Sequence, residues 1–110
     1  MIKFTERQNK LVLGTAQFGS QYGVTNKNYI GVEEGREIVD FCHKNNVREI
    51  DTAINYHGSE KILGNLDLKD YKIATKLPKL NLQGSNYERW INNAISMSLK
   101  KMNLTFFDTL

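Results

Sequence analysis

Apolar and polar positions alternate along the chain in a way that predicts strands separated by helices. Short apolar runs bounded by polar residues predict strands at residues 11–18, 47–53, 71–77 and 106–110. The segments between them carry apolar residues at helical spacing. Because a helix separates each strand from the next, we expect parallel strands joined by right-handed crossovers. The pattern therefore predicts the α/β class.

Three helices are predicted between the strands, at residues 32–46, 58–65 and 86–103. Just before the third helix, Ser85 and Glu88 have the spacing of a capping box, in which each side chain accepts a hydrogen bond from the other's backbone N–H. The apolar face of this helix is predicted at Tyr87, Ile91, Ala94, Ile95, Ser98 and Met102. The three helices are thus expected to cover a parallel sheet.

Polar residues stand where the predicted strands end. Thr15 and Gln17 follow the first strand, Asp51 and Thr52 end the second, and Lys76 ends the third. In parallel α/β folds the carboxyl ends of the strands lie at one edge of the sheet, and sites form there. We therefore expect these five side chains to face one site.

Composition and charge exclude several classes of protein. The 110 residues are 40% hydrophobic and 25% charged, which is typical of one modest globular domain, here expected to span residues 1–110. The formal charge of +3 comes from lysines spread along the chain, so nucleic acid is not an expected partner. Because no apolar run approaches the roughly 20 residues of a membrane span, and the start lacks the apolar segment of a signal peptide, a cytoplasmic location is expected.

Neither a disulfide nor a metal site is expected. Cys42 is the one cysteine of the chain, and it lies on the apolar side of its predicted helix, where a buried and inert thiol is usual. His43 follows it directly and points about 100° away around the helix. The two side chains therefore lack the geometry of metal ligands.

The glycine-rich segment at residues 11–23 matches neither of two phosphate-binding motifs. Gly14 and Gly19 have the spacing of a P-loop, but Ser20 and Gln21 stand where the motif requires Lys and Ser or Thr. A dinucleotide fingerprint opens directly into a helix, whereas a long polar loop follows here. Taken alone, these glycines favour close packing and turn formation.

Three segments taken together resemble the amino-terminal part of an aldo-keto reductase: "GTAQFG" after the first strand, "DTAINYHGSEKILG" after the second and "TKLP" after the third. The family pattern D-T-A-x-x-Y-G-x-S-E-x-x-L-G is matched at Asp51, Thr52, Ala53, Tyr56, Ser59, Glu60, Leu63 and Gly64. The resemblance covers essentially the whole chain, because "NNAISMSLKKMNLTFFDTL" is similar to the family's third barrel helix and fourth strand. It implies the first half of a (β/α)8 TIM barrel.

The resemblance also implies an NAD(P)H-dependent oxidoreductase that reduces an aldehyde or ketone to an alcohol. Tyr56 would be the general acid, Lys76 would lower its proton affinity, and Asp51 would keep Lys76 charged and oriented. The chemistry fits, because a free tyrosine with a pKa of about 10 is a weak acid at neutral pH and a nearby ammonium favours its phenolate. Gly14, Thr15 and Asp51 would line the nicotinamide end of NADPH or NADH.

Each of these side chains also has a structural interpretation. Asp51 and Thr52 can cap the loop that follows them, Tyr56 can be a half-buried aromatic, and Lys76 can be a solvated charge at a strand end. Their convergence on one sheet edge, at the spacings of a known site, favours the catalytic interpretation.

The chain departs from the family pattern in two ways. His57 stands where the family usually has glycine, which alters the turn after Tyr56 or brings an imidazole into the pocket. The family's catalytic histidine follows the fourth strand, beyond Leu110. We therefore interpret the chain as a fragment that is inactive alone and binds no cofactor tightly, since the histidine and most cofactor contacts lie outside it.

An alternative hypothesis is a non-catalytic half-barrel that associates with a second copy or with a complementing chain. The strand predicted at residues 106–110 would leave an apolar edge open to pairing. A third hypothesis, a barrel used only as a binding subunit, is disfavoured because Asp51, Tyr56 and Lys76 occur together. Small carbonyl compounds are the expected substrates.

Overall fold

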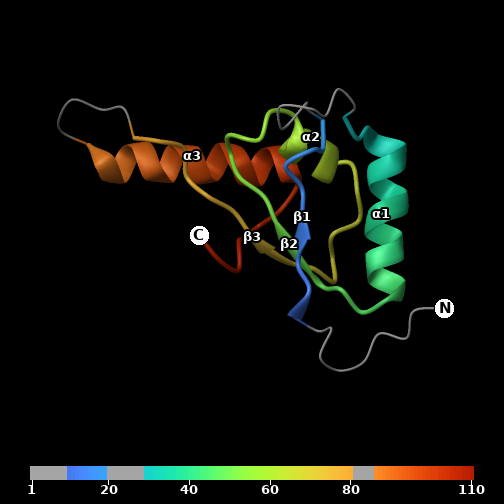
Figure 1. The fold of residues 1–110 in the computed structure, drawn as a ribbon. Coiled ribbons are helices and arrows are strands. Elements are labelled where there is room, and N and C mark those ends of the chain that lie inside the picture. Colours follow the sequence, from blue (N-terminus) through green and yellow to red (C-terminus); the bar gives the residue numbers. More distant parts are fainter. Residues whose placement is uncertain (1–9, 20–28, 81–85) are drawn as a thin grey trace.

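The computed structural model describes residues 10–19, 29–80 and 86–110 (Figure 1). Strands and helices alternate along these residues in the order β1 (Leu13–Gly14), α1 (Val32–Lys44), β2 (Glu49–Asp51), α2 (Ser59–Leu63), β3 (Lys72–Ala74) and α3 (Tyr87–Met102). The three helices begin and end within a few residues of the predicted positions. The α/β class is confirmed, and the strands are shorter than predicted because only their central residues form ladders.

The sheet is parallel and its strands follow one another in the order β1-β2-β3. Leu13 is the register partner of Ile50, which in turn pairs with Ile73. Ile50 and Ile73 are 0% and 2% exposed, so the middle of the sheet is also the centre of the core. This register sets the carboxyl ends of all three strands at one edge, as the sequence predicts.

The strand predicted at residues 106–110 is present only as an isolated bridge. Thr109 lies parallel to Ala74, and its carbonyl oxygen accepts a hydrogen bond from Thr75 N. At Ile73 a side chain takes the place of a backbone acceptor: the carboxylate of Asp108 accepts a hydrogen bond from the backbone N–H of Ile73 at 2.8 Å. A side chain that binds the backbone in this way competes with regular strand pairing.

The helices pack against the sheet to different extents (Figure 1). On α1, Gly35 and Val39 are buried, and Ile38 and Cys42 pack against the core, as the periodicity predicts. The core itself consists of Phe18, Val39, Ile50, Leu63, Leu68, Tyr71, Ile73 and Met102. This core joins the strands to residues of all three helices, namely Val39 of α1, Leu63 of α2 and Met102 of α3.

Helix α3 is buried only near its carboxyl end, at Ser98 and Met102. Its amino-terminal half projects to the side away from α1 (Figure 1), and Tyr87 at its start is 51% exposed. The predicted capping box falls partly outside the described residues, because Ser85 is not among them. The N-cap is Asn86, whose side chain accepts the backbone N–H of Arg89 at 3.0 Å. None of the helices described here is long and apolar enough to cross a membrane.

Candidate active site

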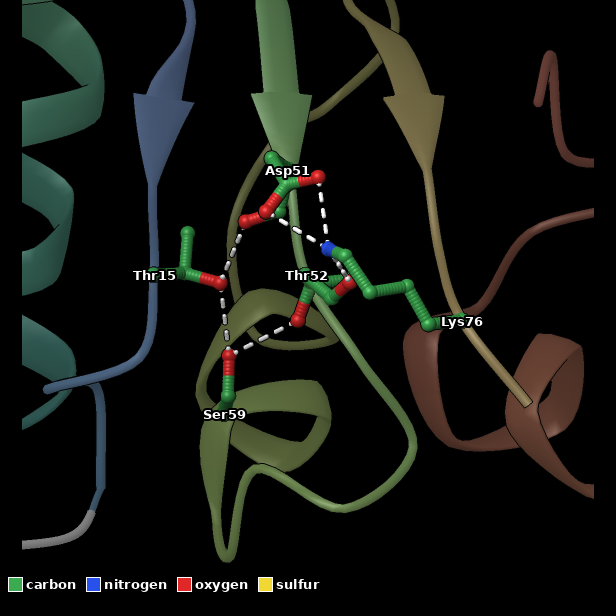
Figure 2. Close-up of polar contacts among 5 residues, drawn as sticks. All are labelled: Thr15, Asp51, Thr52, Ser59 and Lys76. Atoms are coloured by element: carbon green, nitrogen blue, oxygen red, sulfur yellow. Dashed lines mark hydrogen bonds and ion pairs between the residues drawn. The ribbon is translucent and has the colours of Figure 1, made fainter. Parts of the chain in front are cut away.

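Five polar side chains meet at the carboxyl edge of the sheet (Figure 2): Thr15, Asp51, Thr52, Ser59 and Lys76. Four of them lie at or just after the ends of β1, β2 and β3, where the sequence predicts a site. Ser59 was not expected there from the strand ends, because it begins α2. Only its place in the motif, seven residues after Thr52, signals that it belongs to this site.

The charged part of the site is an ion pair between β3 and β2. Lys76 Nζ lies 2.7 Å from both carboxylate oxygens of Asp51 and 3.0 Å from the carbonyl oxygen of Thr52. An ammonium group has three N–H donors, and these three acceptors match them. The side chains of Lys76 and Asp51 are 51% and 39% exposed, so the pair is fixed in orientation and still open to a bound molecule.

Tyr56 lies next to this pair, in the loop between β2 and α2. Lys76 Nζ is 5.6 Å from the centroid of the Tyr56 ring, within the range of a cation–π contact. The backbone of Tyr56 is held on both sides, since its N–H donates to Ala53 O and its carbonyl accepts from Ser59 N, both at 3.0 Å. The structure thus brings Asp51, Tyr56 and Lys76 together, and their catalytic roles stay a prediction.

The uncharged part of the site consists of three hydroxyl groups that are 0% exposed. Ser59 Oγ lies 2.9 Å from Thr15 Oγ1 and 3.0 Å from Thr52 Oγ1. Thr15 Oγ1 also donates to the backbone carbonyl of Asp51 at 3.0 Å. These bonds connect the end of β1, the end of β2 and the start of α2.

The residues predicted to contact a cofactor differ in accessibility. Gly14 is exposed, is the register partner of Asp51, and has nothing within 4 Å of the position that a Cβ would take. The position of this Cβ is therefore open space, next to Asp51 in the register of the sheet. Thr15 is 0% exposed, and its hydroxyl, its backbone N–H and its carbonyl are all hydrogen-bonded inside the protein, so its predicted contact with a cofactor stays a prediction. Gln17, also expected at this edge, accepts Ile30 N through its backbone carbonyl.

Cys42 and His43 have different surroundings on α1. Cys42 packs against the core, and burial raises the pKa of its thiol. His43 points elsewhere, with Nε2 3.2 Å from Asp70 Oδ2. Across the described residues, no group of three or more His, Cys, Asp or Glu side chains could hold a metal ion. His57, which replaces a glycine of the family pattern, is exposed beside Tyr56.

Three comparisons with known proteins found similar sequences or structures. The model of the aldo/keto reductase family matches residues 10–110. The oxidoreductase sirO of Leptosphaeria maculans is 42% identical over 71 residues, which are 60% of this chain and 22% of sirO. The chain therefore spans 22% of the length of this curated relative.

Two solved structures from Pseudomonas aeruginosa, described as aldo-keto reductases, have the same fold over 93% of this chain. The first has a TM-score of 0.71 at 23% identity, and the second a TM-score of 0.68 at 20% identity. The match covers 44% and 42% of these two chains. At such low identity the likeness shows the fold alone, and the chain corresponds to less than half of each solved protein.

Proposed function

The chain belongs to the aldo/keto reductase family, and on this premise we propose that it supplies Asp51, Tyr56 and Lys76 to the active site of an NAD(P)H-dependent carbonyl reductase. The reaction would reduce an aldehyde or ketone to an alcohol. Because the chain spans 22% of its curated relative and under half of the two solved proteins, the proposal concerns a protein that contains the rest of the barrel as well.

The observation that supports this proposal most strongly is the position of Lys76. Its ammonium group contacts the carboxylate of Asp51 at 2.7 Å and lies 5.6 Å from the Tyr56 ring centroid. A solvated charge at a strand end would need neither contact. A lysine held between an acid and a tyrosine, at an accessible sheet edge, is suited to proton transfer.

In the proposed reaction Tyr56 donates its hydroxyl proton to the carbonyl oxygen of the substrate. The phenolate oxygen that remains carries negative charge, and the ammonium of Lys76 stabilises that charge. Asp51 holds Lys76 in place during the transfer through its two hydrogen bonds. Bound NADPH or NADH would supply the hydride, with Gly14 and Asp51 lining its nicotinamide end.

The test is a Tyr56→Phe substitution in a protein that includes the remaining strands of the barrel. We expect carbonyl reduction to be abolished while cofactor affinity, measured by fluorescence titration, stays nearly unchanged, because only the proton donor is removed. The isolated 110-residue chain should show no NADPH-dependent reduction. Equal loss of binding and turnover in Tyr56→Phe, or turnover by the isolated chain, would contradict the proposal.

A second candidate function is association through the outer edges of the sheet. Leu11 and Val12 beside β1 are each 47% exposed, and Phe106 and Leu110 at the other edge are 65% and 57% exposed. Apolar side chains at strand edges favour pairing with another chain. Sedimentation of the 110-residue chain tests this candidate, since a stable monomer at micromolar concentration would exclude self-association.

A further inference from the structure

Three buried hydroxyl groups, those of Thr15, Thr52 and Ser59, are hydrogen-bonded to one another (Figure 2), and Tyr56 lies in the loop between Thr52 and Ser59. Thr52 begins this loop and Ser59 ends it, and their hydroxyl oxygens are 3.0 Å apart. Thr15, from the end of β1, lies 2.9 Å from Ser59 Oγ. All three side chains are 0% exposed, so water cannot replace any of these bonds without opening the loop.

The proton of each hydroxyl can be assigned from the partners. Thr15 donates its single hydroxyl proton to the carbonyl of Asp51, so it accepts the bond from Ser59. Ser59 has then used its own proton, so it accepts a bond from Thr52. The hydrogen bonds therefore run in one direction, from Thr52 through Ser59 and Thr15 to Asp51. Bonds in such a series strengthen one another.

The same residues also hold Lys76. The carbonyl of Thr52 accepts a hydrogen bond from Lys76 Nζ at 3.0 Å, and Asp51 carries the carboxylate that Lys76 binds. Thr52 and Asp51 thus hold both the loop that contains Tyr56 and the lysine that faces the Tyr56 ring. A change at the base of the loop should therefore move the ring relative to the ammonium.

The loop is also held from the side by two glycines. Gly58 has φ +89°, and a Cβ on it would lie 2.7 Å from Gly19 O. A Cβ on Gly19 would lie 2.7 Å from the carbonyl carbon of Gly58. This contact confirms the prediction that Gly19 allows close packing. It also brings the backbone of Gly19, which follows β1, directly against the loop.

We propose that Ser59 is a positioning residue, whose hydroxyl joins the two ends of the loop and thereby sets the Tyr56 ring over Lys76. Its importance for catalysis rests on the proposed function. The positioning itself is a property of this chain and can be measured without any turnover.

The test uses the 110-residue chain labelled with 3-fluorotyrosine and observed by fluorine NMR, with Tyr56→Phe to assign the Tyr56 signal. Ser59→Ala should shift or broaden that signal by more than its linewidth. The signal of Tyr71, a core residue, should not move. Ser98→Ala is the matched control, because Ser98 is also buried but its hydroxyl donates to Glu60 between α2 and α3. It should leave the Tyr56 signal unchanged.

A second pair of variants separates the hydroxyl from the side-chain shape. Thr52→Val keeps the branched shape and removes the hydroxyl donor, so it should shift the Tyr56 signal as Ser59→Ala does. Thr52→Ser keeps the donor, so its Tyr56 signal should stay where it is in the unchanged chain. An unmoved Tyr56 signal in both Ser59→Ala and Thr52→Val would overturn the proposal. So would collapse of the Tyr71 signal in both, because the hydroxyls would then serve the whole fold.

The two proposals can fail separately. If Ser59→Ala moves the Tyr56 signal but Tyr56→Phe in the whole barrel keeps its reductase activity, the positioning stands and the proposed function is wrong. If the Tyr56 signal does not move but Tyr56→Phe abolishes reduction, the reverse holds.

Discussion

The two parts of the candidate site differ in burial and in charge. Asp51 and Lys76 are charged and 39% and 51% exposed, whereas the hydroxyls of Thr15, Thr52 and Ser59 are uncharged and fully buried. An exposed ion pair contributes little to folding. A buried hydroxyl that loses its partner destabilises the fold. Substitutions in the charged part should therefore change chemistry with little effect on stability, whereas substitutions in the hydroxyl part should also lower stability.

The largest expected effect on chemistry comes from Lys76→Met. In a protein with the whole barrel, carbonyl reduction should fall about a hundredfold or more, because the charge that stabilises the phenolate is removed. The free energy of unfolding of the 110-residue chain should change by less than about 1 kcal/mol, since the ion pair is half exposed. Steady-state kinetics and urea unfolding measure the two effects. Large destabilisation together with unchanged turnover would break the comparison.

Next in size is the effect of Gly58→Ala on stability. Alanine at φ +89° is strained, and its Cβ would lie 2.7 Å from the backbone oxygen of Gly19. We expect the free energy of unfolding to fall by about 2 kcal/mol or more. Gly31→Ala is the control, because Gly31 has φ −84° and nothing within 4 Å of the added Cβ. Similar unfolding midpoints for the two variants would show that the glycine contact does not hold the loop.

The fold was largely predictable because its signals are local. Apolar spacing predicts each helix, and the alternation of strands and helices implies parallel pairing. The prediction was wrong for residues 106–110, where a single bridge replaces a strand. That outcome depends on the carboxylate of Asp108 meeting Ile73 N, a contact between residues far apart in the sequence.

The charged part of the site was predictable for a similar reason. Asp51 ends β2, and Lys76 follows the end of the neighbouring parallel strand β3, so the topology alone brings them together. Thr15 and Thr52 of the hydroxyl part were expected at this edge for the same reason. Ser59 could not be predicted in this way, because its position requires the start of α2 to return to the end of β1. No local pattern shows that Ser59 reaches Thr15.

Tyr71 provides a reference outside the site, with a smaller effect that depends on pH. Its buried hydroxyl donates to Val39 O at 2.6 Å, and burial raises the pKa of Tyr71 to about 12. A tyrosine in the unfolded chain has a pKa of about 10, so as pH rises the unfolded chain loses this proton first. The contribution of Tyr71 to stability should therefore decline between pH 10 and 12.

Tyr71→Phe should remove this decline and lower the free energy of unfolding at neutral pH by about 1 kcal/mol. Urea unfolding across the pH range, compared with the unchanged chain, measures both effects. Thr52→Val keeps Tyr71 and should show the same decline as the unchanged chain, because the aliphatic hydroxyl that it removes does not ionise. An identical pH dependence in the unchanged chain and Tyr71→Phe would assign the decline to other groups.

The smallest expected change in stability is that of Asp51→Asn. Asparagine has the same shape but only one side-chain oxygen, so the charge of an exposed pair and one of its two hydrogen bonds from Lys76 are lost, and the free energy of unfolding should change by less than about 1 kcal/mol. Because salt screens exposed charges, the difference from the unchanged chain should shrink in about 1 M salt. Thr52→Val, measured beside it, should destabilise the chain by about 1–3 kcal/mol and show little salt dependence. A greater loss for Asp51→Asn than for Thr52→Val would reverse the comparison, because the ion pair rather than the hydroxyls would then stabilise this edge of the sheet.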